Sequence, residues 1–130
     1  MRKIATYLTL LTGFACTSAM AAEKGTIAIL VNSLDNPYYA AEAKGAEAKA
    51  KSLGYQTLVL SHGEDVKRQG ELISLVIGRK VQGIILDNAD SQASVAAVQQ
   101  AKNAGIPVVL INREIPVDGV ALAQKIGRAH

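Results

Sequence analysis

Two adjacent tyrosines, Tyr38 and Tyr39, follow directly on Asn36 and Pro37. Asn36 is a favourable N-cap, and Pro37 suits the first position of a helix, where its missing N–H is not needed. Since adjacent helical positions are about 100° apart, we expect Tyr39 to pack inward and Tyr38 to point toward the end of the preceding strand. An aromatic face held there suits the C–H-rich face of a sugar or polyol. Two half-buried tyrosines that seal a helix end explain the pattern equally well.

A second polar pair, Asn112 and Arg113, follows the apolar run 107–111. Arginine presents five donors in a rigid fork, and asparagine presents both a donor and an acceptor. Together they suit vicinal hydroxyl groups, which need both kinds of partner. The alternative is a surface arginine that pairs with the neighbouring Glu114.

The remaining polar residues favour neither catalysis nor metal binding. Asp87 and Asp90 are further candidates for ligand binding, but they do not complete an octahedral ligand set, and Asp90 or Ser91 is expected to cap a helix. His62 and His130 are too isolated to indicate zinc or a catalytic triad. No Gly-x-Gly-x-x-Gly follows the first apolar run, which disfavours a nucleotide. We therefore expect no catalytic residue, no metal and no cofactor.

Four apolar runs predict the strands that position these residues, at 26–31, 57–60, 83–86 and 107–111. They do not alternate with polar residues, which is typical of strands buried on both faces of a parallel sheet. Residues 119–124, near the end of the chain, are expected to form a fifth strand. Helical patterns lie between the runs, from Pro37 to a stop at Gly54 and over about 66–79 and 92–104.

This order of elements predicts an α/β fold, a doubly wound parallel sheet of Rossmann-like type. Ligands bind such sheets beyond the carboxyl ends of the strands. The polar residues named above follow those ends, so we expect them to meet at one edge of the sheet.

The amino terminus has a different character from the rest of the chain. A basic start, an apolar run and the small-x-small pattern Ala19–Ala21 predict a cleaved signal peptide over residues 1–21, and hence a periplasmic location. A membrane anchor is disfavoured because the run is short for a bilayer. Lipidation of Cys16 is disfavoured because "GFAC" departs from the lipoprotein pattern. Removing Arg2 and Lys3 from the 14 basic residues leaves 12 against 11 acidic ones, well interspersed, which disfavours nucleic-acid binding.

Three segments carry a resemblance to a known family: "GTIAILVNSLDNPYYAAEAKGAEAKAKSLGY", "VQGIILDNADSQA" and "AGIPVVLINREI". With the leader, they resemble the type 1 periplasmic binding proteins of the ribose-binding-protein cluster over residues 24–124. The resemblance implies the substrate-binding component of an ATP-driven importer, a monomer that captures a monosaccharide or polyol between two lobes. Its implied partners are the membrane permease and a chemoreceptor.

The resemblance also assigns roles to single residues. Asn36, Tyr38 and Tyr39 would correspond to the first-lobe asparagine and the two stacking aromatics, and Asn112 and Arg113 to the usual Asp-Arg pair. Tyrosine stands where phenylalanine is frequent, and Asn112 replaces the usual aspartate. Both departures leave the identity of the sugar open.

Family members are much longer than this chain, so we expect residues 22–125 to form a truncated N-terminal lobe, with the second lobe missing and sugar binding by the 130-residue chain millimolar or undetectable. The ending "IGRAH" back-translates as ATC GGA AGA GCA CAC, which looks like sequencing-adapter DNA. We therefore interpret residues 126–130 as a non-native tail.

Two other classes of protein remain as alternatives. A secreted α/β enzyme would need a nucleophile elbow or a glycine-rich phosphate turn, and the sequence shows neither, although the fold alone does not exclude one. A flavodoxin-like regulator with Asp87 as its switch residue would work in the cytosol, which conflicts with the leader.

Overall fold

The computed structural model describes residues 23–125, so the predicted leader at 1–21 and the predicted tail at 126–130 lie outside the described residues. The described chain alternates strands and helices along its length. The elements are β1 (Thr26–Val31), α1 (Pro37–Ser52), β2 (Gln56–Ser61), α2 (Val66–Gly78), β3 (Gly83–Asp87), α3 (Val95–Asn103), β4 (Val108–Ile111) and β5 (Ala123–Lys125). They form one sheet of order β2-β1-β3-β4-β5 in which each neighbouring pair is parallel, which confirms the predicted doubly wound α/β fold.

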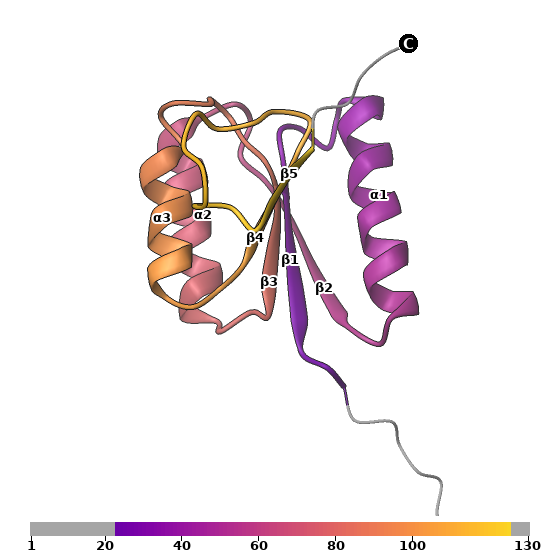
Figure 1. The fold of residues 1–130 in the computed structure, drawn as a ribbon. Helices are drawn as coiled ribbons and strands as arrows, with labels where there is room; N and C mark the ends of the chain where they lie inside the picture. Colours follow the sequence, from indigo (N-terminus) through magenta and orange to yellow (C-terminus); the bar gives the residue numbers. More distant parts are fainter. Residues whose placement is uncertain (1–22, 126–130) are drawn as a thin grey trace, which may run out of the picture.

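The helices cover both faces of the sheet, with α1 on one side and α2 and α3 on the other (Figure 1). The central strand β1 shows why the sequence reads as a continuous apolar run. Ile29 and Val31 pack toward α1 against Ala43, whereas Ala28 and Leu30 pack into the core beneath α2 and α3. Successive side chains of a strand point to opposite faces, so a strand covered on both sides needs apolar residues at every position.

Local hydrogen bonds set where the helices begin. Asn36 caps α1 as predicted, because its Oδ1 accepts from the Tyr38 N–H at 3.0 Å. The third helix begins at Val95 rather than near Gln92. Asp90 Oδ1 accepts from the backbone N–H groups of Gln92 and Ala93 at 2.9 and 2.7 Å. The carboxylate thus holds these amides in a preceding turn, so the predicted capping by Asp90 acts on that turn rather than on α3.

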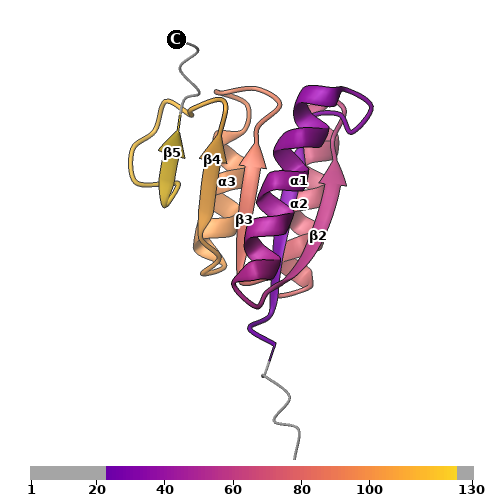
Figure 2. The ribbon, with the colours of Figure 1, turned by 90° about the vertical axis from the view of Figure 1, so that its right-hand side faces the viewer.

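The strands finish at one edge of the sheet, as Figure 2 shows from the side of α1. In register, Leu30 of β1 lies opposite Leu86 of β3, and Leu86 lies opposite Leu110 of β4. Asn112 follows β4 with φ at 65°, a left-handed conformation that asparagine tolerates better than most residues, and it turns the chain there. The loops after β1, β3 and β4 therefore emerge side by side. No helix within residues 23–125 is long and apolar enough to cross a membrane.

Candidate ligand-binding site

Three of the predicted site residues lie in contact at the carboxyl edge of the sheet. The Tyr38 hydroxyl lies 3.5 Å from Asn112 Oδ1, to which it donates. Asn112 Nδ2 donates toward both carboxylate oxygens of Asp87, at 3.4 and 3.3 Å. These contacts join the first turn of α1 to the ends of β3 and β4. Their lengths exceed the usual 2.7–3.2 Å, so the groups are adjacent but weakly bonded and keep hydrogen-bonding capacity for another partner.

Arg113 is anchored beside this group. Its Nη1 donates to the carbonyl oxygen of Ala89 at 2.7 Å, and its own carbonyl oxygen accepts from Asn88 Nδ2 at 2.7 Å. Burial raises the pKa of the Asp87 carboxyl, and the nearby Arg113 guanidinium partly opposes that rise. Arg113 thus lies over the loop after β3, and the ion pair with Glu114 that the sequence left open is not formed between these two described residues.

The two tyrosines divide as their helical spacing predicted. Tyr39 is partly buried and packs against the cluster of Ile29, Val31 and Ala43. Tyr38 is 56% exposed, and its ring meets the Tyr39 ring edge-on, with centroids 5.2 Å apart and planes at 84°. The Tyr39 ring therefore contacts the Tyr38 ring edge-on, and the exposed part of the Tyr38 ring remains available for a ligand.

Two other predicted site residues lie apart from this group. Asn36 uses its side-chain oxygen to cap α1 and lines a separate hollow of about 570 Å³ with Asn32 and Glu64, between the loops after β1 and β2. Asp90 is exposed and uses a carboxylate oxygen to hold the turn before α3. The structure brings together Tyr38, Asp87, Asn112 and Arg113.

The site contains a fifth polar residue that the sequence analysis did not select, Glu42. Burial raises the pKa of Glu42, and the nearby charge of Asp87 raises it further. Burial also raises the pKa of Asp87, although the Asn112 hydrogen bond and the charges of Arg113 and His62 oppose that effect. The charge of Glu42 is the main cause of a raised pKa at the Tyr38 hydroxyl, which places Glu42 close to Tyr38. The spacing of four residues from Tyr38, which places two side chains on one helix face, is a signal in the sequence that was available.

Buried polar residues behind the site fix the loop after β3. The fully buried His62 lies with Nε2 2.7 Å from the Asp87 carbonyl oxygen, which ties the end of β2 to the end of β3. Gln69 of α2 accepts from the Ala89 N–H at 2.7 Å and donates to the Ser94 hydroxyl at 2.8 Å. His62, which looked isolated in the sequence, and Gln69 therefore have structural roles that position Asp87.

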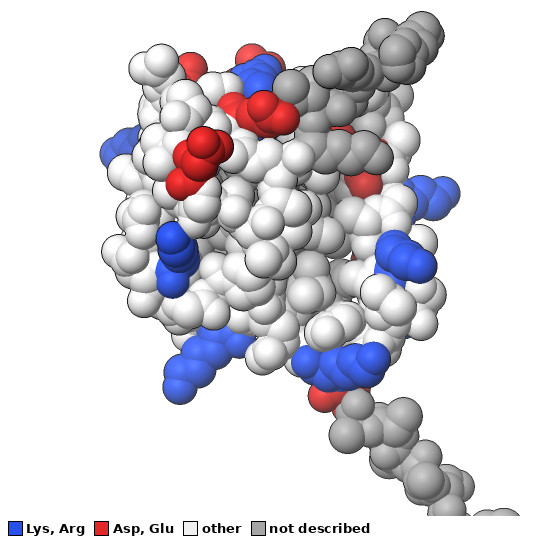
Figure 3. Space-filling view, viewed as in Figure 1, with Lys and Arg blue, Asp and Glu red and all other residues white. Residues whose placement is uncertain are grey.

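Acidic and basic side chains are distributed unevenly between the two ends of the sheet. Figure 3 shows acidic side chains gathered toward the end of the molecule where the strands finish, with lysines and arginines mostly on the flanks and at the other end. At the site itself, the carboxyl groups of Glu42 and Asp87 lie near the guanidinium of Arg113, which suits a ligand rich in hydroxyl donors better than a phosphate. Among residues 23–125, no group of three His, Cys, Asp or Glu side chains is arranged to hold a metal ion.

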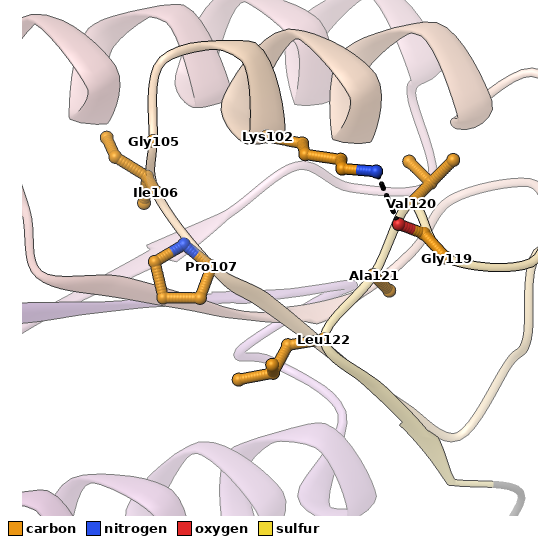
Figure 4. Close-up of a pocket in the computed structure, with 8 residues that line it drawn as sticks. All are labelled: Lys102, Gly105, Ile106, Pro107, Gly119, Val120, Ala121 and Leu122. Carbon is orange, nitrogen blue, oxygen red and sulfur yellow. Dashed lines mark hydrogen bonds between the residues drawn. The ribbon is translucent and has the colours of Figure 1, made fainter.

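A further hollow, of about 390 Å³, lies at the opposite end of the sheet where β4 begins (Figure 4). Its lining is mainly apolar and includes Ile106, Pro107 and Leu122. The amine of Lys102 already donates to the Gly119 carbonyl oxygen at 2.7 Å. This hollow lacks the open donors and acceptors of the carboxyl edge, so we place the candidate site at that edge.

Parallel α/β proteins bind small ligands beyond the carboxyl ends of their strands, where this lobe has open polar side chains. Residues 27–124 match the periplasmic binding protein domain. The chain therefore belongs to the periplasmic binding protein family, which confirms the resemblance seen in the sequence.

Three comparisons place the chain within that family. It is 50% identical over 110 residues to the D-apiose import binding protein of Actinobacillus succinogenes, which covers 85% of this chain and 36% of that protein. It is 34% identical over 116 residues to the ribose import binding protein of Escherichia coli, covering 88% and 38%. A solved structure of an ABC transporter periplasmic solute binding protein from A. succinogenes, with bound D-allose, has a TM-score of 0.67 and 30% identity, covering 72% and 34%. The chain thus spans about a third of the length of these relatives.

Proposed function

We propose that this chain is the sugar-binding first lobe of a periplasmic substrate-binding protein that serves an ATP-driven importer. The observation that carries the proposal is the convergence of Tyr38, Asp87, Asn112 and Arg113 at the strand ends. The chain that contains these residues is 50% identical over 110 residues to a D-apiose import binding protein.

The side chains suggest how a monosaccharide or polyol binds. The exposed ring of Tyr38 offers a flat apolar surface for the C–H face of the ligand, supported by Tyr39. Asn112 offers a donor and an acceptor, Asp87 offers acceptors, and the unbonded N–H groups of Arg113 offer donors to neighbouring hydroxyls. Closure of a second lobe over this surface would then trap the ligand, and a permease would recognise the closed state.

D-apiose is the first candidate ligand, because the relative that imports it is 50% identical and the ribose import binding protein is 34% identical. The departures seen in the sequence, two tyrosines and Asn112, alter the hydrogen-bonding groups of the wall and leave the identity of the sugar open. The periplasmic location, the monomeric state and a contact with a chemoreceptor remain predictions that rest on the family. No observation favours the alternative of a secreted enzyme.

The experiment that tests this function uses the full-length protein from the same locus. A thermal-shift screen over D-apiose, D-ribose, D-allose and xylitol, followed by calorimetry, is expected to find one ligand with micromolar affinity. Tyr38→Ala and Arg113→Ala should each weaken binding at least about tenfold and leave the unliganded melting temperature nearly unchanged.

The matched control is Arg79→Ala, at the exposed end of α2. It removes an arginine outside the site and should bind the sugar like the parent. Retained affinity in both site variants would contradict the placement of the site. Absence of binding to any sugar or polyol by the full-length protein would contradict the function.

A further inference from the structure

Glu42 is an acceptor without a donor in the described part of the protein. It lies on α1 one turn after Tyr38 and is partly buried. Its Oε2 is shielded from solvent and has no hydrogen-bond partner among residues 23–125. A shielded carboxylate oxygen without a donor is unfavourable, and such oxygens are normally satisfied.

The neighbours of Glu42 do not supply that donor. Positions four residues apart share one helix face, so Glu42 and Tyr38 present their side chains to the same side. The Tyr38 hydroxyl donates to Asn112 and not to Glu42. The charged group that acts on Glu42 is the carboxyl of Asp87, which is acidic like Glu42 itself. Arg113, the cation of the site, bonds the Ala89 carbonyl oxygen through Nη1, and none of its other N–H groups bonds the shielded oxygen of Glu42 within residues 23–125. Glu42 therefore has acidic and hydroxyl neighbours on the face where the ligand is proposed to lie.

We infer that Glu42 is a ligand-binding residue, whose carboxylate accepts a hydrogen bond from a hydroxyl of the sugar stacked on Tyr38. The inference rests on the proposed function and deepens it, because it makes Glu42 a determinant of which sugar binds. Because Oε2 is shielded even from water, the Glu42 carboxylate must turn about its last side-chain bond to meet a ligand. A sugar with a hydroxyl at that edge then gives the carboxylate a donor, whereas a sugar that lacks this hydroxyl does not. Failure to satisfy a polar group of this kind is a strong source of discrimination between ligands.

The test uses the full-length protein and the sugar that binds best among D-apiose, D-ribose and D-allose. Calorimetry on Glu42→Gln, which keeps the shape and one acceptor but removes the charge, is expected to show about tenfold weaker binding. Glu42→Leu removes both oxygens and should weaken binding about a hundredfold. The matched control Glu47→Gln makes the same change one and a half turns further along α1, where the carboxylate contacts Lys51 and Thr57, and it should bind like the parent.

Monodeoxy derivatives of the same sugar separate a direct contact from an indirect one. If Glu42 accepts from one hydroxyl, the derivative that lacks this hydroxyl should bind the unsubstituted protein weakly. The Glu42→Leu substitution should then weaken the binding of that derivative little further. Two results would overturn the inference and leave the proposed function standing. One is a Glu42→Leu variant whose affinity for the unmodified sugar stays within about twofold of the unsubstituted protein. The other is an equal loss of affinity in Glu42→Leu for the unmodified sugar and for every deoxy derivative. A parent protein that binds no sugar would instead remove the proposed function, and the inference with it.

Discussion

At the scale of single residues, the carboxyl edge of the sheet contains two kinds of polar side chain. Asn36 and Asp90 bond backbone amides at 2.7–3.0 Å and so hold the chain in place. Tyr38, Asn112 and Asp87 make contacts of 3.3–3.5 Å with one another, which are long enough to exchange for a ligand. Of the seven residues predicted for the site, the first kind thus holds the backbone, and the second kind keeps hydrogen-bonding capacity for a ligand.

The buried carboxyl of Asp87 should make stability depend on pH. Its pKa is raised above 3.8 in the folded state, chiefly by burial, so the folded protein holds a proton in a range where the unfolded chain has released it. The folded state then binds more protons, and the free energy of unfolding falls as the pH rises through that range. In the full-length protein, Asp87→Asn should lose less stability than the parent as the pH rises above 3.8, the ordinary pKa of the carboxyl, as measured by urea unfolding midpoints.

The control for this profile is Asp118→Asn, an exposed carboxylate on the loop before β5, which should follow the parent at every pH. Some dependence should remain in Asp87→Asn, because the pKa of Glu42 is raised as well. Parallel profiles for the parent and Asp87→Asn would show that the carboxyl does not retain its proton.

The sequence predicted the division between Tyr38 and Tyr39 because Pro37 fixes where the helix starts and helical geometry does the rest. It predicted the proximity of Asp87 and Asn112 because parallel strands finish at one edge. It did not identify Glu42 or Gln69. For Glu42 the sequence offers one signal, its spacing of four residues from Tyr38 on the same helix face. Gln69 has no such signal, because its partners lie 20 and 25 residues away along the chain.

At the scale of elements, the first four strands followed the prediction closely, whereas β5 spans Ala123–Lys125 instead of 119–124 and α3 begins at Val95 instead of near Gln92. The predicted run 26–31 is β1 to the residue, because burial on both faces leaves a continuous apolar signal. Asp90 caps the amides of Gln92 and Ala93 in the turn that precedes α3, and the regular helix begins only at Val95. The cap is local, but the turn is also held at both ends by Gln69 of α2, which bonds Ala89 and Ser94.

Removing the Gln69 link should therefore loosen the loop after β3. Gln69→Leu keeps the apolar volume but leaves the Ala89 N–H and the Ser94 hydroxyl without their partner in the core. We expect a loss of about 1–3 kcal/mol in the free energy of unfolding of the full-length protein, together with weaker sugar binding because Asp87 is less well positioned. Urea unfolding and calorimetry measure the two effects.

Gln100→Leu provides the comparison, because this exposed α3 side chain makes a solvent-exposed hydrogen bond of 3.3 Å to Ser74 of α2, and its loss should stay within about 0.5 kcal/mol of the parent. If Gln69→Leu is as stable as Gln100→Leu, the buried link does not hold the loop. If stability falls and sugar affinity does not, the link supports the fold alone.

At the scale of the whole molecule, the two faces of the sheet are unequally covered. Helix α1 lies over one part of its face, and in Figure 2 no other helix of residues 23–125 lies in front of β4 and β5 on that side. Ile85, Val109 and Leu122 line a mainly apolar hollow of about 410 Å³ there, with Leu53 at the end of α1. Leu122 is 73% and Leu53 48% exposed. The sequence could not show this, since an apolar strand looks the same whether or not a helix covers it.

An uncovered apolar face should make the 130-residue chain associate with itself, because contiguous exposed apolar surface is removed from water when copies meet. We expect the chain to bind a hydrophobic dye and to sediment as more than a monomer, with the oligomer dissociating on dilution. Changing Leu53 and Leu122 together to Glu should reduce both dye fluorescence and sedimentation rate. The control is Leu34→Glu, which changes a leucine of comparable exposure, 45%, in the loop between β1 and α1. A parent chain that stays monomeric and binds no dye would show that this face is protected, and equal effects of the control would show that association does not use it.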